Sequence, residues 1–390
     1  MKKYLKTWSK SLPELLFSII FLAGIIFRLL MLLKYKNVPL TFDAKGYYDM
    51  AVNMTNFYAA SFREPFYILI VKMFVKLTGL GEFAVRIQSF TFSVFSILIL
   101  YLLGLRLFNR FVGICSAVFL SLNPFLIYNC TRGLRTEITI FLLLIFTFIA
   151  FPLNFLCNNA KLIILTFIAA ALSLIKIYYL PIMILLIFYI FFKEKCPAWF
   201  LKTMIAFIVV ILLVMPFLIS NKNTYNDMFC ISNMNAVFWR NQEFAGKPGF
   251  PTIAEVKKNP YIGPKITTFD YLFKLHSIRE VIMRFIQGYY FCIFKYIYQT
   301  MWIFSPLVYF GMIGIIAMLF TDKRLFVLLM LIVILPNVFI LPINTIGYIR
   351  VDRRFAMVMY PFFSICISYG IYFVFTKIKN FRDSNAKLKA

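Results

Sequence analysis

The stretch Leu15–Leu33, LLFSIIFLAGIIFRLLMLL, decides the class of fold, because Arg28 is its only charged residue. A helix crosses the hydrocarbon of a bilayer with about 20 apolar residues, since lipid cannot satisfy free backbone groups. The run is long for the apolar core of a signal peptide, and no small-residue cleavage site follows it. The stretch therefore predicts a retained first membrane span.

About nine further runs of this kind follow along the chain. They are Phe83–Phe108, Phe111–Tyr128, Ile138–Phe155, Leu162–Ile175, Tyr178–Phe192, Thr203–Ser220, Phe291–Phe320, Leu325–Leu341 and Phe355–Phe375. No alternating pattern typical of strands competes with them. The sequence therefore predicts an all-α polytopic integral membrane protein with about ten transmembrane helices.

The overall composition agrees with this class. Of 390 residues, 62% are hydrophobic and only 14% are charged, too few for a soluble protein. The 41 Lys and Arg against 15 Asp and Glu give a net charge of +26, which by itself suggests a nucleic-acid partner. The basic residues lie between the apolar runs rather than on one soluble face, so we expect membrane lipids and no nucleic acid as partners.

The order of apolar and polar segments predicts four regions. An N-terminal transmembrane module spans residues 1–220 and includes a first polar loop at 34–82. A loop region at 221–290 and C-terminal transmembrane helices at 291–376 follow, and a basic tail occupies 377–390. Within the first loop, Pro65–Leu77 places Lys72 and Lys76 on one helix face opposite an apolar face, which favours an amphipathic interfacial helix over an eleventh span.

An even number of spans puts the two long loops on the side opposite the termini. The short segments on the terminal side, such as Arg106–Arg110 and Lys193–Lys202, are basic. By the positive-inside rule the termini and the basic tail lie in the cytoplasm and the loops on the outer face.

Three predicted outer-face clusters combine carboxylates with arginines. The first loop holds Thr41–Ala51, TFDAKGYYDMA, and then Arg63-Glu64-Pro65-Phe66-Tyr67. A short loop reads Cys130–Glu137, CTRGLRTE, and the last reads Tyr348–Arg354, YIRVDRR. Each alone also fits a helix cap or an interfacial anchor. Together, acids near cations at a membrane face indicate a base or a ligand site.

The motifs Asp43-x-x-x-Tyr47-x-x-x-Ala51, Arg63-Glu64-Pro65-x-Tyr67 and Arg132-x-x-Arg135-Thr136-Glu137 resemble the GT-C membrane glycosyltransferases. The resemblance is closest to the branch of protein O-mannosyltransferases and the lipid A aminoarabinose transferase, and it covers residues 41–151 best. It implies a GT-C-like bundle and a sugar donor carried on a polyprenyl phosphate. The family usually has Asp where this chain has Glu137, and His-Pro-Pro or Lys-Pro where it has Glu64-Pro65.

The resemblance implies Asp43 as the catalytic base, and the chemistry agrees. The donor phosphate is a good leaving group, so one carboxylate that accepts the acceptor's proton suffices, with inversion at the anomeric carbon. Glu137 is the second catalytic candidate, to orient the acceptor or to hold a divalent metal, whose use stays open. The expected substrate-binding residues are Tyr47, Arg63, Glu64, Tyr67, Arg132, Arg135, Arg353 and Arg354.

The sequence therefore predicts an inverting glycosyltransferase of a bacterial inner membrane, with a glycan, lipid or protein acceptor. A flippase for polyprenyl-linked glycans is one alternative, but it needs charges at midplane depth in several spans, and only Arg28 and Lys176 are candidates. An O-antigen ligase or polymerase is another, because loop 221–290 resembles the late outer loop of such proteins.

Overall fold

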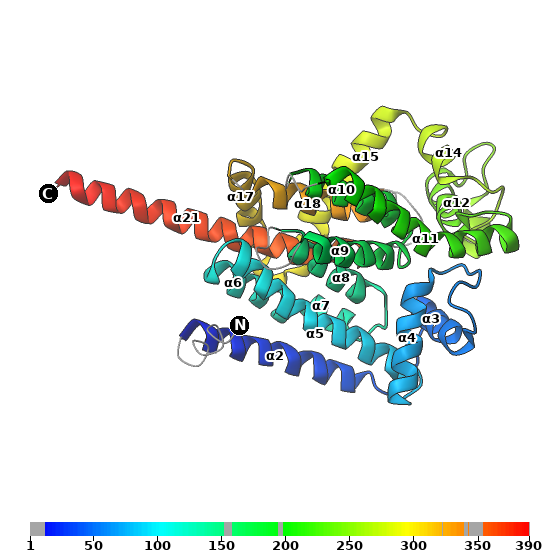
Figure 1. The fold of residues 1–390 in the computed structure, drawn as a ribbon, viewed down its shortest axis with the longest axis horizontal. Helices are drawn as coiled ribbons and strands as arrows, with labels where there is room; N and C mark the ends of the chain where they lie inside the picture. The colour runs from blue at the N-terminus through cyan, green and yellow to red at the C-terminus, as the bar shows by residue number, and fades with distance from the viewer. Residues whose placement is uncertain are drawn as a thin grey trace.

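The computed structural model describes residues 12–151, 158–193, 198–321, 323–338, 342 and 354–389. Within these ranges all regular secondary structure is helical. The apolar helices of the bundle are α2 (Leu12–Lys34), α5 (Glu82–Leu107), α6 (Arg110–Leu122), α8 (Thr136–Ala150), α9 (Asn158–Ser173), α10 (Tyr179–Lys193), α11 (Trp199–Tyr225), α17 (Val308–Leu319), α18 (Arg324–Val338) and α21 (Tyr360–Lys389). Figure 1 shows them packed side by side.

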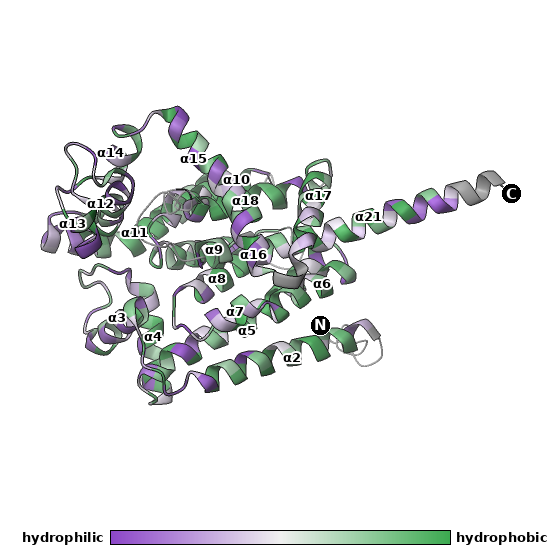
Figure 2. Ribbon diagram, turned by 180° about the vertical axis from the view of Figure 1, so that it is seen from behind, coloured by the Kyte–Doolittle hydropathy of each residue, from purple (hydrophilic) through white to green (hydrophobic). Residues whose placement is uncertain are grey.

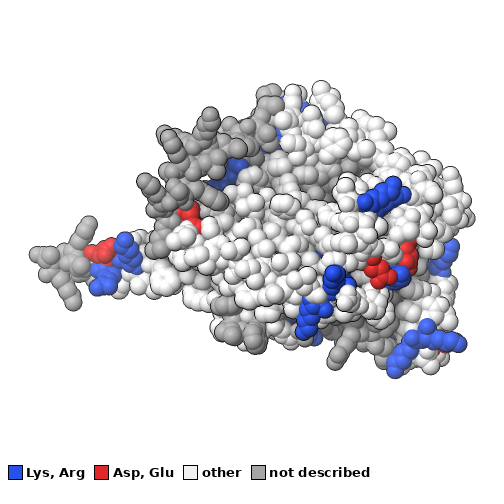
Figure 3. Space-filling model, turned by 90° about the horizontal axis from the view of Figure 1, so that it is seen from below, with Lys and Arg blue, Asp and Glu red and all other residues white. Residues whose placement is uncertain are grey.

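Four described helices, α2, α5, α11 and α21, are long and apolar enough to cross a membrane. The other six helices of the bundle are apolar and shorter, with 10–17 residues each. Each helix corresponds to one predicted apolar run, so the prediction of an all-α polytopic membrane protein is confirmed. In Figure 3 a broad surface without charged side chains separates charged groups gathered toward the two ends of the molecule.

Two predicted runs are not single helices. The run Phe111–Tyr128 is interrupted at Asn123, whose side chain accepts a hydrogen bond from the Leu126 N–H and caps the short helix α7 (Pro124–Asn129). The run Phe291–Phe320 divides into a π-helix η1 (Phe291–Ile297), α16 (Tyr298–Thr300), a 3₁₀-helix η2 (Trp302–Leu307) and α17. Apolar run length alone does not reveal such breaks in the helical hydrogen bonding.

The first polar segment folds into α3 (Phe42–Asn53) and α4 (Pro65–Thr78). Helix α4 matches the predicted amphipathic helix: it buries Ile68 and Val71 and exposes Lys76 and Leu77. In Figure 1 it lies across the end of the bundle beside α3, as expected of an interfacial helix rather than of the eleventh span that the sequence left as an alternative.

Helix α11 continues to Tyr225, into the start of the predicted loop 221–290, and α15 (Ile278–Tyr290) leads directly into η1 at the end of that loop. Between them lie α12 (Cys230–Phe244), α13 (Ile253–Lys258) and α14 (Thr268–Phe273). In Figure 1 these helices lie with α3 and α4 at one end of the bundle, and the C-terminal half of α21 extends beyond the opposite end. Figure 2 shows the end with α12–α14 as more hydrophilic than the bundle.

Close helix contacts hold the bundle together. A Cβ atom added at Gly314 of α17 would lie 1.9 Å from the Cys366 carbonyl oxygen of α21, and one at Gly370 would lie 1.9 Å from the Phe310 oxygen. Small residues at such crossings let helix backbones approach closely, as in membrane proteins generally.

Arg28, the charged residue of the first span, is completely buried. Its guanidinium donates to the Leu120 and Ser121 carbonyl oxygens, both at 2.8 Å, and to Ser93 Oγ at 2.9 Å. The two carbonyls belong to the last turn of α6, where a positive charge is favourable. Arg28 thus ties α2 to α5 and to the end of α6.

Candidate active site

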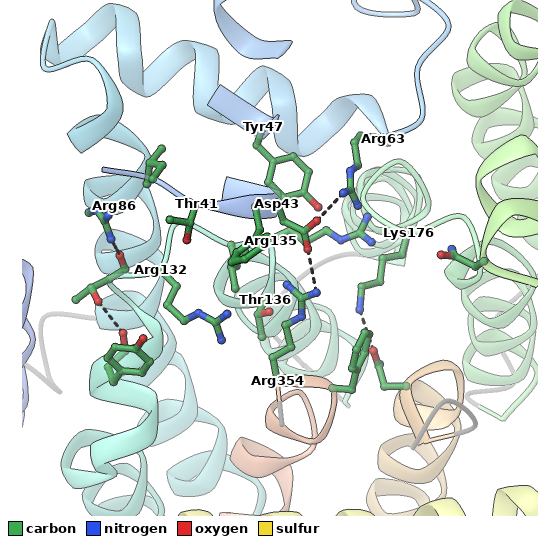
Figure 4. A pocket seen from close by; sticks show the side chains of 18 of the residues that line it. Thr41, Asp43, Tyr47, Arg63, Arg86, Arg132, Arg135, Thr136, Lys176 and Arg354 are labelled. Atoms are coloured by element: carbon green, nitrogen blue, oxygen red, sulfur yellow. Dashed lines mark hydrogen bonds and ion pairs between the residues drawn. The ribbon is translucent and has the colours of Figure 1, made fainter. Parts of the chain in front are cut away.

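Asp43 lies in the first turn of α3, where a helix N-terminus favours a carboxylate. Its Oδ1 accepts a hydrogen bond from Arg63 at 2.5 Å, and its Oδ2 accepts one from Arg354 at 2.9 Å. Figure 4 shows the carboxylate between the two guanidinium groups. The backbone of the preceding residue, Phe42, has φ +50°, a conformation that non-glycine residues rarely adopt. The structure thus brings together three residues that the sequence assigned to the site.

Burial raises the pKa of Asp43, but the charges of Arg63 and Arg354 oppose burial and lower the pKa below its usual value overall. The side chain is therefore an ionised carboxylate at neutral pH. As long as both arginines hold it, it is also a weak base, so proton abstraction requires that they loosen.

Tyr47 supports Arg63 one helical turn after Asp43. The Arg63 guanidinium lies 5.4 Å from the centre of the Tyr47 ring, within the range of a cation–π contact. Tyr47 meets Tyr67 edge to face, with ring centroids 4.7 Å apart. Tyr67 is fully buried behind it, with its hydroxyl 2.9 Å from the Gly133 carbonyl oxygen. Tyr47 faces the site, whereas Tyr67 supports Tyr47 from behind.

Glu64 and Arg135 form a second ion pair, and both side chains are mostly buried. Arg135 also donates to the Ile175 carbonyl oxygen at 2.8 Å. Burial lowers the pKa of Arg135, but the adjacent Glu64 charge outweighs it and the pKa is raised. The second carboxylate oxygen of Glu64 is buried without a hydrogen-bond partner. This pair joins the start of α4 to the start of α8.

These residues surround a cavity of about 790 Å³. Of the side chains described along its wall, Asp43 is the only carboxylate, and the cations are Arg63, Arg86, Arg132, Arg135, Lys176 and Arg354. A volume of this size is typical of a small-molecule site, and the excess of cations favours an anionic ligand. One side of the cavity is apolar, with Val38, Leu40 and Phe42 from the chain after α2.

Glu137 does not line this cavity. Its side chain is buried in α8 and accepts a hydrogen bond from Asn129 at 2.8 Å. Successive helical residues turn by about 100°, so Thr136 faces the cavity and Glu137 faces the bundle interior. Arg132 does line the cavity, and Arg353 lies outside the described residues.

Several cavity residues were not among those assigned from the sequence. Arg86 of α5 donates to the carbonyl oxygens of Val38, Pro39 and Thr131 and so fixes the loops around the site.

The second polar segment also contributes to the cavity wall. Helix α12 contributes Asn235, Phe238 and Trp239, and Tyr261 follows α13. Lys176, between α9 and α10, also lines the cavity. A single lysine between two apolar runs was the one sequence signal for this last residue.

The described residues contain no group of three or more His, Cys, Asp or Glu side chains that could hold a metal ion. Asp43 has both oxygens bound to arginines, and Glu137 is bonded to Asn129 away from the cavity. These two carboxylates do not form a donor set for a metal.

A family model described as dolichyl-phosphate-mannose-protein mannosyltransferase matches residues 63–220. No curated protein matches the chain. Among solved structures, ArnT from Cupriavidus metallidurans, bound to undecaprenyl phosphate, is similar with a TM-score of 0.58 and 10% identity. The match covers 90% of this chain and 59% of ArnT.

The oligosaccharyltransferase of Archaeoglobus fulgidus, in a complex with zinc and sulfate, is similar with a TM-score of 0.54 and 16% identity. That match covers 96% of this chain and 50% of the oligosaccharyltransferase, so the chain spans 59% of the length of ArnT and half that of the oligosaccharyltransferase. At these identities the similarity is one of fold. The resemblance read from the sequence is confirmed at that level: the chain has the fold of the GT-C membrane glycosyltransferases.

Proposed function

We propose that this protein is an inverting glycosyltransferase that moves a sugar from a polyprenyl-phosphate carrier to an acceptor hydroxyl. The observation that carries the proposal is Asp43, a carboxylate at the wall of a cationic cavity and bound by Arg63 and Arg354. The family match and the carrier bound to ArnT support the choice of a polyprenyl-phosphate donor. The acceptor is a glycan, a lipid or a protein.

In the proposed reaction the acceptor oxygen attacks the anomeric carbon from the face opposite the phosphate. The bond between that carbon and the phosphate oxygen breaks, and the polyprenyl phosphate leaves with the bonding electrons. Asp43 accepts the proton of the acceptor hydroxyl. Arg63 and Arg354 stabilise the negative charge that develops on the leaving phosphate, because hydrogen bonds between charged groups are stronger than those between neutral groups.

The arginines also link donor binding to base strength. A phosphate bound in the cavity competes with Asp43 for the guanidinium groups of Arg63 and Arg354. As these groups turn toward the phosphate, the carboxylate loses the charges that lower its pKa. Asp43 therefore becomes a stronger base when the donor is in place.

The activity is tested with purified protein in detergent and a panel of sugar-charged undecaprenyl phosphates. The expected result is release of undecaprenyl phosphate with transfer of the sugar, abolished in Asp43→Asn. Absence of release with every donor would contradict the proposal and favour transport of a polyprenyl-linked glycan instead.

We further propose that the cavity opens at the outer face of a cell inner membrane. The basic short segments between the predicted spans support this orientation. Lys247→Cys, exposed after α12, should react with a membrane-impermeant thiol reagent in intact spheroplasts. Lys377→Cys, exposed on α21, is the matched control and should react only after permeabilisation. The reverse pattern would overturn the orientation.

A further inference from the structure

Lys176 occupies a tight connection between two apolar helices. Its backbone N–H donates to the Leu172 carbonyl at 2.9 Å, and its own carbonyl accepts from the Tyr179 N–H at 3.0 Å. The side chain is buried and points into the cavity, toward the space that Asp43 and Arg354 face (Figure 4). The turn thus holds a lysine at the cavity wall, on a segment separate from those that carry the arginines.

The ammonium group of Lys176 has a neutral partner. It donates to Asn337 Oδ1 at 2.9 Å, while Asn337 Nδ2 donates to the Tyr179 hydroxyl at 2.9 Å. The Tyr179 contact orients the amide with its oxygen toward Lys176. The ammonium also lies 5.5 Å from the centre of the Phe355 ring. Within the described part of the chain no carboxylate forms an ion pair with it, and an ammonium has three donors to satisfy.

The other cavity cations near Lys176 are already paired with carboxylates. Arg63 and Arg354 hold Asp43, and Arg135 holds Glu64. Burial, and to a lesser extent the charges of Arg135 and Arg354, lower the pKa of Lys176 to about 7 against a weaker opposite effect of Glu64. The side chains that contact the ammonium, Asn337 and Phe355, are neutral. Tyr179, which contacts the Asn337 amide, is also neutral. An anion in the cavity would supply the negative charge that is missing beside the Lys176 ammonium.

We propose that Lys176 binds the phosphate of the lipid-linked donor. The phosphate bridges Lys176 to the arginines around Asp43 and so places the anomeric carbon near the base. This inference rests on the proposed function, since it names the group that recognises its donor. It also implies that the protein takes up a proton when the phosphate binds, because the new negative charge favours the ammonium form.

The test uses farnesyl phosphate, a short polyprenyl phosphate, and the full-length protein in detergent. At about pH 8 a phosphate monoester is a dianion, so any proton taken up on binding goes to the protein. Calorimetry in two buffers of different ionisation enthalpy gives both the dissociation constant and the proton count. The wild type should take up about one proton per site.

Lys176→Met should weaken binding about ten- to a hundredfold and remove the proton uptake, because a charged hydrogen bond is lost. Lys176→Arg should restore part of the affinity without proton uptake, since arginine is protonated at this pH. Lys76→Met, exposed on α4, is the matched control and should bind like the wild type. If Lys176 had only a structural role, Lys176→Met would have a changed thermal stability but would take up as many protons on binding as the wild type.

Two outcomes would overturn the role of Lys176 without contradicting the proposed glycosyltransferase function. Unchanged affinity and proton uptake in Lys176→Met would show that the phosphate binds elsewhere. Equal affinity of the wild type for inorganic phosphate and farnesyl phosphate would assign the site to a free phosphate rather than to a lipid carrier. Failure of the wild type to bind farnesyl phosphate at all would instead count against the proposed function itself.

Discussion

Arg354 donates a hydrogen bond to Asp43 across 311 positions of the sequence, with the guanidinium nitrogen 2.9 Å from Oδ2. The contact joins α3 to α20 (Arg354–Met357), which directly precedes the last long helix. Asp43 is therefore held jointly by the first polar loop, through Arg63, and by the C-terminal helices. The proposed base is correctly placed only when both ends of the chain are packed together.

Asp43→Asn should lower kcat/KM for sugar transfer by about 10²–10⁴, because the amide cannot accept the acceptor's proton. Binding of farnesyl phosphate should persist, since the arginines remain. Asp49→Asn is the matched control: Asp49 is exposed on the same helix and pairs with Lys45, and its loss should leave turnover unchanged. Rates near those of the wild type in Asp43→Asn would refute the role of this carboxylate.

Arg354→Gln should move the acid limb of the pH–rate profile upward. In the wild type the lowered pKa keeps Asp43 ionised, so the acid limb of kcat/KM should lie below the usual titration range of an aspartate. Without the Arg354 charge the pKa of Asp43 rises, so activity should be lost at a higher pH than in the wild type. The profile is measured with a sugar-phosphodiester donor, which does not titrate in this range.

The matched control for that profile is Arg279→Gln, an exposed arginine on α15, whose acid limb should coincide with that of the wild type. An identical acid limb in Arg354→Gln would mean that Asp43 does not govern the low-pH loss of activity. The ion pairs of Asp43 with Arg63 and Arg354 also make the free energy of unfolding depend on pH. A lowered pKa in the folded state stabilises the protein above the unfolded pKa, and this contribution is lost as pH falls through the folded pKa.

The ion pair between Glu64 and Arg135 should show strong coupling in a double-mutant cycle. Glu64→Gln or Arg135→Met alone leaves a mostly buried charge without its partner and should lower the free energy of unfolding by about 3–5 kcal/mol. The double variant removes both charges and should recover much of that loss. Thermal unfolding in detergent checks this, and additive losses would show that the two side chains act independently.

The sequence predicted the ten apolar helices well, because long apolar runs favour helices in lipid, but it did not predict the breaks at Asn123 and after Ile297. It also placed Asp43 and Arg63 in one site, since both lie in the first polar loop. It did not predict that Glu137 turns away from the cavity, because the rotation of α8 is set by packing against other helices rather than by spacing along the chain.

Lys176 was missed as a cavity residue for a related reason. Its partner Asn337 lies 161 positions away, on α18, and no local pattern connects the two. Phe238 and Tyr261, which also line the cavity, likewise come from a segment whose sequence predicts only a folded loop. Contacts between distant segments decide which residues share the site.

Arg28→Met should destabilise the bundle without changing the cavity. The substitution removes the donors that satisfy the last carbonyls of α6, and each buried acceptor left without a partner costs about 1–3 kcal/mol. We expect a loss of roughly 2–5 kcal/mol in the free energy of unfolding, with farnesyl phosphate affinity unchanged in the protein that remains folded. Lys34→Met, exposed at the end of α2, is the matched control and should change stability little. Equal stability of Arg28→Met and the wild type would show that lipid headgroups or water satisfy these carbonyls, and that Arg28 does not join α2 to α6.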